Sequence, residues 1–428
     1  MAFMFEKLEV CQKADSFAGR IGALPRSLPL ASSLCALLLC WAGCASSAAP
    51  LHLGERPLRD RIAERSYPSV FMAWNRADNL KEDFWTTAAR HDLIFAGPEF
   101  FGLQWNDTFP GLATGFTDES VALARERRKD LLKRNPNLVL LVEIRYRDAQ
   151  RSWLPEGHRW WRRDGEGRIV NEWNEGGYLQ MDFSNGEYRS QVARQAKAVV
   201  ESGVADGVML DWWTDDDDRL ALVQCIRDRV GDKALILVNA NDLTTPRTAA
   251  FINGYFMECY RTRTSEDWRR IAETLTWAEK NLRQPRINCL ETWYHTSRND
   301  EYLMRATTTL SLTLSDGYCL FSDPNPLPSP DHLHSWYPFW QRSLGRALSP
   351  GRRRDDGSYT REFDNGTVVY NPMGNAEVRV SFPEQRLSVA SGKCSISHVV
   401  SPCDGDILLK NASLPQKKIF GPEKANRE

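Results

Sequence analysis

The chain has 428 residues and a formal net charge of −1, from 55 Lys and Arg against 56 Asp and Glu. This balance, without a basic stripe, argues against a nucleic acid as partner. The apolar and charged fractions, 42% and 26%, are typical of a globular protein long enough for a large domain and a small one. The 15 tryptophans stand out, most of them between Trp74 and Trp293.

Residues 1–49 are predicted to be a leader. Arg20 and Arg26 precede the apolar run "LPLASSLCALLLCWAG", and small residues follow it, which is the order of a secretory signal. The run is short for a membrane span. Ala-Gly-Cys, ending at Cys44, resembles the bacterial lipoprotein cleavage box, and ordinary cleavage near Ala48 is the alternative. We therefore expect an exported protein, periplasmic or at the cell surface, whose one membrane attachment would be a lipid on Cys44.

The ten cysteines do not indicate a disulfide framework. Cys259, Cys289 and Cys319 lie in apolar runs and are expected in the core. Cys394 and Cys403, nine residues apart, could bridge a hairpin in an exported protein. No Cys/His spacing matches a zinc site, so no metal is predicted. No organic cofactor is predicted either.

Short apolar runs with helical stretches between them recur over residues 68–346. Their apolar character is continuous rather than alternating, which is typical of strands buried on both faces of a parallel sheet. The eight runs cover residues 69–74, 93–100, 138–146, 207–213, 234–241, 254–260, 287–293 and 317–323.

Helices are expected between most of these runs, at 118–134, 186–202, 265–283, 299–314 and 331–346. Thr264 and Asp267 have the spacing of a capping box. The alternation of strands and helices over 68–346 predicts a (β/α)₈ TIM barrel that would carry the catalytic site. The rival, a doubly wound open sheet, would carry a Gly-rich phosphate fingerprint after the first strand, and none is present.

The pattern changes after residue 346. "SYTREFDNGTVVYNPMGNAEVRVSF" alternates with period two and contains Asn365-Gly366, a strong hairpin signal. Residues 347–410 are therefore predicted to be a small β-sandwich-like domain. The polar residues 411–428 are predicted to be a flexible tail.

Carboxylates stand where three of the expected strands end. These are Asp211 in the fourth, Glu258 in the sixth and Glu291 in the seventh. The active sites of barrels lie at this end of the strands. Converging carboxylates are costly unless one serves as an acid and another as a base or nucleophile, as in glycoside hydrolysis. We take these three as catalytic candidates, with structural ion pairing as the alternative for each.

Aromatic, amide and acidic side chains at the same strand ends are candidates for binding a substrate. Aromatic faces suit a sugar ring, and amides suit its hydroxyls. Glu143 could instead pair with Arg145, and Asp215–Asp218 are expected to serve the N-terminus of the next helix. The candidates are Trp74, Glu143, Trp212, Trp213, Asn239, Asn241, Tyr260, Trp293 and His295.

Two segments, "YLQMDFSNGEYRSQVARQ" and "SGVADGVMLDWW", resemble the signature of the hypothetical glycosyl hydrolase-like family fifteen, a group of TIM-barrel glycosidases. "REFDNGTVVYNP" resembles the small β domain often appended to such barrels. The fourth strand is also similar to that of alpha-galactosidase-like barrels. That resemblance implies Asp211 as nucleophile and Glu258 as acid/base. A second group of barrels, with its pair on strands four and seven, implies instead Glu291 as nucleophile and Asp211 as acid/base.

The sequence thus predicts an exported glycoside hydrolase of carbohydrate metabolism, acting on an oligo- or polysaccharide. Which of Glu258 and Glu291 partners Asp211 stays open. The first alternative is a non-catalytic carbohydrate-binding barrel lipoprotein. A metal-dependent barrel hydrolase is a second alternative, but it would need paired histidines on the first strand, and "VFMAWNRAD" has none.

Overall fold

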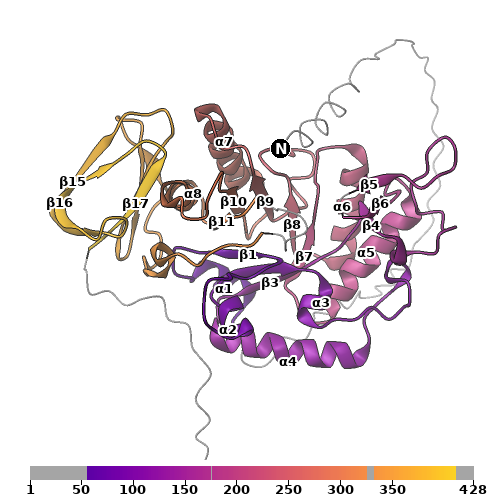
Figure 1. The fold of residues 1–428 in the computed structure, drawn as a ribbon. Coiled ribbons are helices and arrows are strands. Elements are labelled where there is room, and N and C mark those ends of the chain that lie inside the picture. Colours follow the sequence, from indigo (N-terminus) through magenta and orange to yellow (C-terminus); the bar gives the residue numbers. More distant parts are fainter. Residues whose placement is uncertain (1–54, 175, 325–331, 411–428) are drawn as a thin grey trace, which may run out of the picture. The chain divides into compact units, whose positions relative to one another are not determined.

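The computed structural model describes residues 55–174, 176–324 and 332–410. Its central feature is a sheet of eight parallel strands in the order β1-β2-β3-β7-β8-β9-β10-β11 (Figure 1). A parallel bridge between Val70 and Cys319 joins the last strand to the first, so the sheet closes into the predicted barrel. The strands are β1 (Phe71–Ala73), β2 (Leu93–Ala96), β3 (Val139–Glu143), β7 (Gly207–Leu210), β8 (Leu235–Asn239), β9 (Gly254–Cys259), β10 (Cys289–Trp293) and β11 (Tyr318–Ser322).

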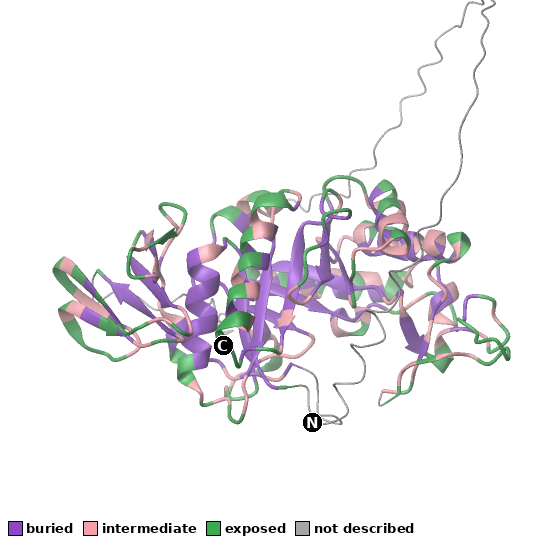
Figure 2. Cartoon of the chain, turned by 90° about the horizontal axis from the view of Figure 1, so that it is seen from above, coloured by how far each residue is buried: buried purple, intermediate pink, exposed green. Residues whose placement is uncertain are grey.

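The barrel strands are buried almost throughout because their side chains face either the barrel interior or the surrounding helices (Figure 2). Close approach of the strands also constrains the sequence. A Cβ at Gly207 would come within 2.0 Å of the carbonyl oxygen of Leu235 on the neighbouring strand. Only glycine fits there, directly below the strand end that carries Asp211.

The helices lie largely where the sequence predicts them. The capping box of Thr264 and Asp267 is confirmed. Asp216 caps α6, with two further aspartates in its first turn, so the acidic run serves a helix N-terminus as predicted. The helices are α1 (Leu58–Ala63), α2 (Phe84–Ala88), α3 (Pro98–Phe101), α4 (Asp118–Arg134), α5 (Gly186–Glu201), α6 (Asp217–Val230), α7 (Ser265–Asn281) and α8 (Glu301–Leu314).

The helix expected at 331–346 is wrong. Among the residues described there, 332–346, the one helical element is the short 3₁₀ turn η4 (Pro338–Gln341). Pro338 would remove a backbone donor and clash inside a helix. The two other 3₁₀ turns are η2 (Pro110–Leu112) and η3 (Arg151–Trp153).

The long connection after β3 forms a small antiparallel sheet in the order β4-β6-β5. Trp160 and Trp161 are buried within it, so these two tryptophans pack the excursion and do not offer open faces. The strands are β4 (Asp148–Gln150), β5 (Asn171–Trp173) and β6 (Tyr178–Gln180).

The C-terminal strands form one six-stranded antiparallel sheet in the order β12-β13-β14-β17-β15-β16, where the sequence suggested a sandwich. The predicted hairpin is present, with Phe363 paired to Gly366. Arg305 on α8 forms a buried ion pair with Asp404, with Nε 2.8 Å from a carboxylate oxygen. The strands are β12 (Arg352–Arg353), β13 (Tyr359–Phe363), β14 (Gly366–Asn371), β15 (Val378–Ser388), β16 (Cys394–Val400) and β17 (Asp404–Leu409).

Cys394 and Cys403 are both free thiols in the structure, so the predicted bridge between them is wrong. Cys394 begins β16 on the sheet edge, and Cys403 sits in the turn before β17.

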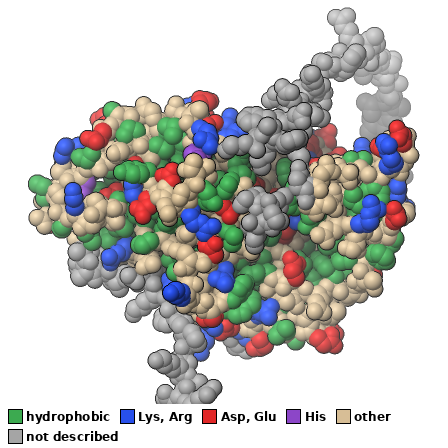
Figure 3. All heavy atoms as spheres, viewed as in Figure 1, with side chains coloured by type: hydrophobic (Ala, Val, Ile, Leu, Met, Phe, Trp, Pro, Cys, Tyr) green, Lys and Arg blue, Asp and Glu red, His purple; other side chains and the backbone are tan. Residues whose placement is uncertain are grey.

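On the face drawn in Figure 3, acidic and basic side chains are interspersed, as the balanced charge predicts. In the described part of the chain, no helix has the length and apolar character needed to cross a membrane. The predicted leader, Cys44 and the tail lie outside the described residues.

Candidate active site

Left-handed backbone at residues other than glycine concentrates at one end of the barrel. Five such residues occur in the described chain, and four directly follow or lie near the ends of barrel strands. This conformation is costly for an L-residue and tends to gather at functional sites. The four are Trp74 (φ 51°), Trp212 (φ 55°), Asn241 (φ 50°) and His332 (φ 54°).

Asp211, Asn239 and Glu258 meet at this end through one shared nitrogen. The side-chain amide of Asn239 donates to Asp211 Oδ1 at 2.8 Å and to Glu258 Oε2 at 2.8 Å. Because both bonds start from the same atom, the two carboxylate oxygens are at most about 5.6 Å apart. Asn239 therefore sets the spacing of the two acids.

The surroundings of the two acids move their pKa values upward. Burial, followed by the charge of Glu143, raises the pKa of Asp211 to about 6, against the opposing effect of its bond from Asn239. Burial also raises the pKa of Glu258 well above its usual range, and the neighbouring Glu291 adds to this while His332 opposes it. At neutral pH, Asp211 is thus mostly ionised and Glu258 protonated.

Glu291 lies beside this pair but is held differently. Its side chain has no exposure to solvent. Its Oε1 accepts from the Ser322 hydroxyl at 2.6 Å and lies 2.9 Å from His332 Nδ1. The other ring nitrogen of His332, Nε2, is 4.0 Å from Glu258 Oε1. Glu291 therefore fixes the histidine that stands next to Glu258.

His332 is the site residue that the sequence analysis missed. Its ring stacks on Trp74, with centroids 4.9 Å apart and planes inclined by 24°. Trp74 in turn donates from Nε1 to Glu143 Oε2 at 2.7 Å, and Glu143 is also near Arg145, at 3.6 Å. Glu143 thus both orients Trp74 through a hydrogen bond and forms the ion pair with Arg145 that the sequence suggested. The signal for His332 was the closely spaced histidines of "HLHSW", which begins ten residues after the last barrel strand ends at Ser322.

The two adjacent tryptophans of the fourth strand end have different surroundings. Trp213 is 2% exposed and donates from its indole nitrogen to Thr248. Trp212 is 44% exposed, and the Arg147 guanidinium lies 4.4 Å from its ring centroid. Its carbonyl accepts from the Tyr146 hydroxyl at 2.5 Å, which helps to hold the left-handed backbone. Of the two, only Trp212 offers an accessible face.

The remaining predicted binding residues end or closely follow β8, β9 and β10. Asn241 Oδ1 and Trp293 Nε1 are buried polar atoms without a hydrogen-bond partner in the protein, so each can bond a ligand or a water. Tyr260 packs against Trp293 with ring centroids 5.6 Å apart. His295 is further out and bonds Thr262 Oγ1 from Nε2 at 3.2 Å.

Glu258, Glu291 and His332 are also the one group in the described residues whose side-chain atoms could together approach a metal ion, all within 4.8 Å of one another. Two carboxylates and an imidazole are acceptable ligands for zinc. A metal would, however, have to displace the bonds that Glu291 makes with Ser322 and His332. The present hydrogen bonds fit an acid pair with a supporting histidine better.

No known family profile matches the chain. A search of curated proteins also finds no match. Solved structures similar to this chain include a maltogenic alpha-amylase from Thermotoga neapolitana, with 13% identity over 81% of this chain and 99% of that one, and a TM-score of 0.47. They also include a cyclomaltodextrinase, with 12% identity over 83% and 79% and a TM-score of 0.48.

A third similar structure is the glycoside hydrolase domain of PelA from Pseudomonas aeruginosa, with 14% identity over 60% of this chain and 95% of that domain, and a TM-score of 0.38. At such low identities and scores, these likenesses indicate neither a substrate nor a reaction for this chain.

Proposed function

We propose that this protein is a retaining glycoside hydrolase acting on an oligo- or polysaccharide, with Asp211 as nucleophile and Glu258 as general acid/base. The observation that carries the proposal is the Asn239 amide, which bonds one oxygen of each carboxylate and so holds these two oxygens within about 5.6 Å of each other. Retaining glycosidases have carboxyl groups about 5–5.5 Å apart, whereas inverting enzymes need about 6.5–9.5 Å to admit a water.

The pKa order of the pair suits these roles. Asp211, whose pKa is about 6, is ionised at neutral pH and attacks the anomeric carbon. Glu258, whose pKa burial raises further, donates its proton to the departing glycosidic oxygen. In the second step, the Glu258 carboxylate takes a proton from water. That water attacks the same carbon and releases Asp211.

Glu258 is a better partner for Asp211 than Glu291. Glu291 is fully buried, and both Ser322 and His332 bond its carboxylate. A sugar oxygen would have to break those contacts to reach it. We assign Glu291 and His332 to positioning, since they fix the ring that stands 4.0 Å from Glu258.

Two buried polar atoms of the site that have no hydrogen-bond partner in the protein support a polyhydroxylated substrate. Asn241 Oδ1 can accept from a sugar hydroxyl, and Trp293 Nε1 can donate to one. The exposed ring of Trp212, backed by Arg147, offers a flat apolar face to a sugar ring. The resemblance to hypothetical glycosyl hydrolase-like family fifteen belongs to this proposal and awaits the same test.

The test is release of reducing sugar from a panel of starch, dextran, xylan, galactomannan, chitosan and β-glucan. We expect one of these to be cleaved, and Asp211→Asn and Glu258→Gln each to lower kcat by at least about 10³-fold, because each removes a reacting group. Thr248→Val, which alters packing behind the site, serves as the control. A glycan that binds and is never cleaved, with equal binding in Asp211→Asn, would favour the non-catalytic binding barrel instead.

We further propose that the protein is exported and that Cys44 either carries a lipid or is removed with the leader. The charged segment, apolar run and small residues before Ala48 support this. Mass spectrometry of the mature N-terminus distinguishes a diacylated Cys44 from a free N-terminus near Ala48. An N-terminus at Met1 in membrane-free cytoplasmic protein would contradict export.

A further inference from the structure

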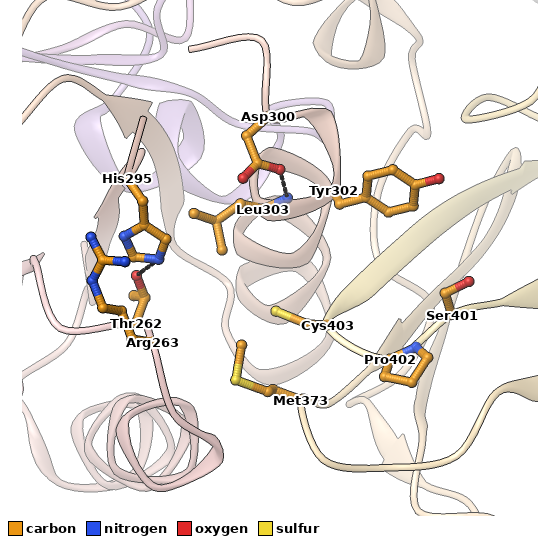
Figure 4. A pocket seen from close by; sticks show the side chains of 10 residues that line it. All are labelled: Thr262, Arg263, His295, Asp300, Tyr302, Leu303, Met373, Ser401, Pro402 and Cys403. Carbon is orange, nitrogen blue, oxygen red and sulfur yellow. Dashed lines mark hydrogen bonds between the residues drawn. The ribbon is translucent and has the colours of Figure 1, made fainter. Parts of the chain in front are cut away.

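A hollow lies where the loops after β9 and β10 face the C-terminal sheet. It measures about 420 Å³, within the size range of small-ligand sites. Figure 4 shows Thr262, Arg263 and His295 on one side and Met373, Pro402 and Cys403 on the other, with the first turn of α8 between them. We call this hollow the outer groove.

The outer groove is connected to the acids by two chain segments that continue side by side. Glu258 and Glu291 are register partners on β9 and β10. Two residues further along, the rings of Tyr260 and Trp293 are in contact. Two residues beyond these, Thr262 and His295 share a hydrogen bond.

Four residues of extended chain span at most about 13 Å, which is longer than one sugar ring. A glycan that extends from the acids along these two segments is therefore long enough to reach Thr262 and His295 in the lining of the outer groove. The Trp293 indole nitrogen is buried and unpartnered part-way along this path, where a sugar hydroxyl could accept from it.

Side chains of the outer groove combine apolar faces with balanced polarity. Tyr302 is 60% exposed, and Arg305 lies 4.6 Å from its ring centroid, which steadies the ring. The charges of Arg263 and Asp300 offset each other across the lining. Such a surface suits an uncharged chain of hydroxylated rings better than an acidic or a basic one.

The rim of the outer groove also carries backbone strain. Cys403 has a φ of 53°, and it is the fifth of the left-handed non-glycine residues of the described chain, the other four being at the barrel mouth. Strain of this kind persists where the surrounding structure enforces it and tends to mark functional surfaces. The turn before β17 thus has the same left-handed backbone at a non-glycine residue as the barrel mouth that holds the acids.

We infer that the outer groove is a distal subsite for an uncharged polysaccharide, shared between the barrel and the C-terminal sheet. The inference rests on the proposed function, because it extends the glycan from the same acids. It implies that the enzyme prefers long chains and that Tyr302 and His295 contribute to that preference.

The experiment compares kcat/KM on the polysaccharide that the panel identifies and on the disaccharide of the same linkage, which is too short to bridge the acids and the outer groove. Tyr302→Ala is expected to lower kcat/KM on the polymer about 10-fold and to leave kcat/KM on the disaccharide nearly unchanged. Ile396→Ala, at a similarly exposed side chain on β16, is the matched control. Equal loss on both lengths, or no loss on either, would overturn the distal subsite while leaving the hydrolase proposal intact.

Affinity electrophoresis of the full chain in gels containing each polysaccharide separates the two proposals. If no polysaccharide is cleaved, but one retards the wild-type protein and not Tyr302→Ala, the outer groove stands and the hydrolase proposal falls. If retardation is the same for wild type and Tyr302→Ala, the outer groove is not a glycan subsite. Tyr302 is exposed, so its truncation is expected to leave folding unaffected.

Discussion

Replacing Asn239 by Leu would remove the amide that joins the two acids while keeping a side chain of similar size. A hydrogen bond to a charged group contributes about 1.5–3 kcal/mol, and 1.36 kcal/mol corresponds to one pKa unit. The bond from Asn239 lowers the pKa of Asp211 from what burial alone would give. Its loss should therefore raise that pKa from about 6 by at least about one unit.

The assay is the pH profile of kcat/KM on the glycan that the panel identifies. In the wild type, we expect the acid limb near pH 6, where Asp211 ionises. In Asn239→Leu, that limb should move up by about one unit, and the alkaline limb should rise with it, because the same amide also bonds Glu258. Thr248→Val, which removes the acceptor of the Trp213 indole and bonds neither acid, should leave both limbs in place even if its Tm falls. An unshifted acid limb in a folded Asn239→Leu protein would refute the assignment of Asp211 as the ionising group.

Other substitutions separate stability from activity. Asp206→Asn should cost about 3–5 kcal/mol in urea unfolding at pH 7, because Asp206 is a buried partner of two arginines. Since its folded pKa is lowered to about 2, its stabilisation is present above about pH 4 and lost as pH falls toward 2, so wild type and variant should converge there. Trp213→Ala should lower the free energy of unfolding by about 3–5 kcal/mol, whereas Trp212→Ala should change it little and raise KM instead. His332→Gln should lower kcat about 10- to 100-fold with little change in KM, and an unchanged kcat would exclude a positioning role.

The barrel and the meeting of its acids could be predicted from the sequence because both follow from local patterns. Continuous apolar runs indicate parallel strands, and the ends of such strands share one edge. Asp211, Asn239 and Glu258 end neighbouring strands, so their proximity follows from strand order alone. Which two carboxylates form the pair could not be predicted, because it depends on the single nitrogen of Asn239 that bonds both.

His332 and the different positions of Trp212 and Trp213 could not be foreseen, and the reason is backbone conformation. Trp212 is left-handed, which breaks the strand alternation that would otherwise assign each tryptophan to a face. His332 also has a left-handed backbone, at the start of the stretch for which the sequence predicted a helix that does not form. The burial of Glu291 depends on Ser322 of the adjacent strand, a contact that no motif in the sequence announces.

The anomeric configuration of the first sugar released tests the carboxylate pair most directly. Proton NMR of an early time point, on an oligosaccharide of defined linkage, reports that configuration before mutarotation. With the Asn239-bonded oxygens of Asp211 and Glu258 held within about 5.6 Å, the account predicts a product of the same configuration as the bond cleaved. An inverted product would show that water attacks directly, and would contradict Asp211 as a nucleophile paired with Glu258.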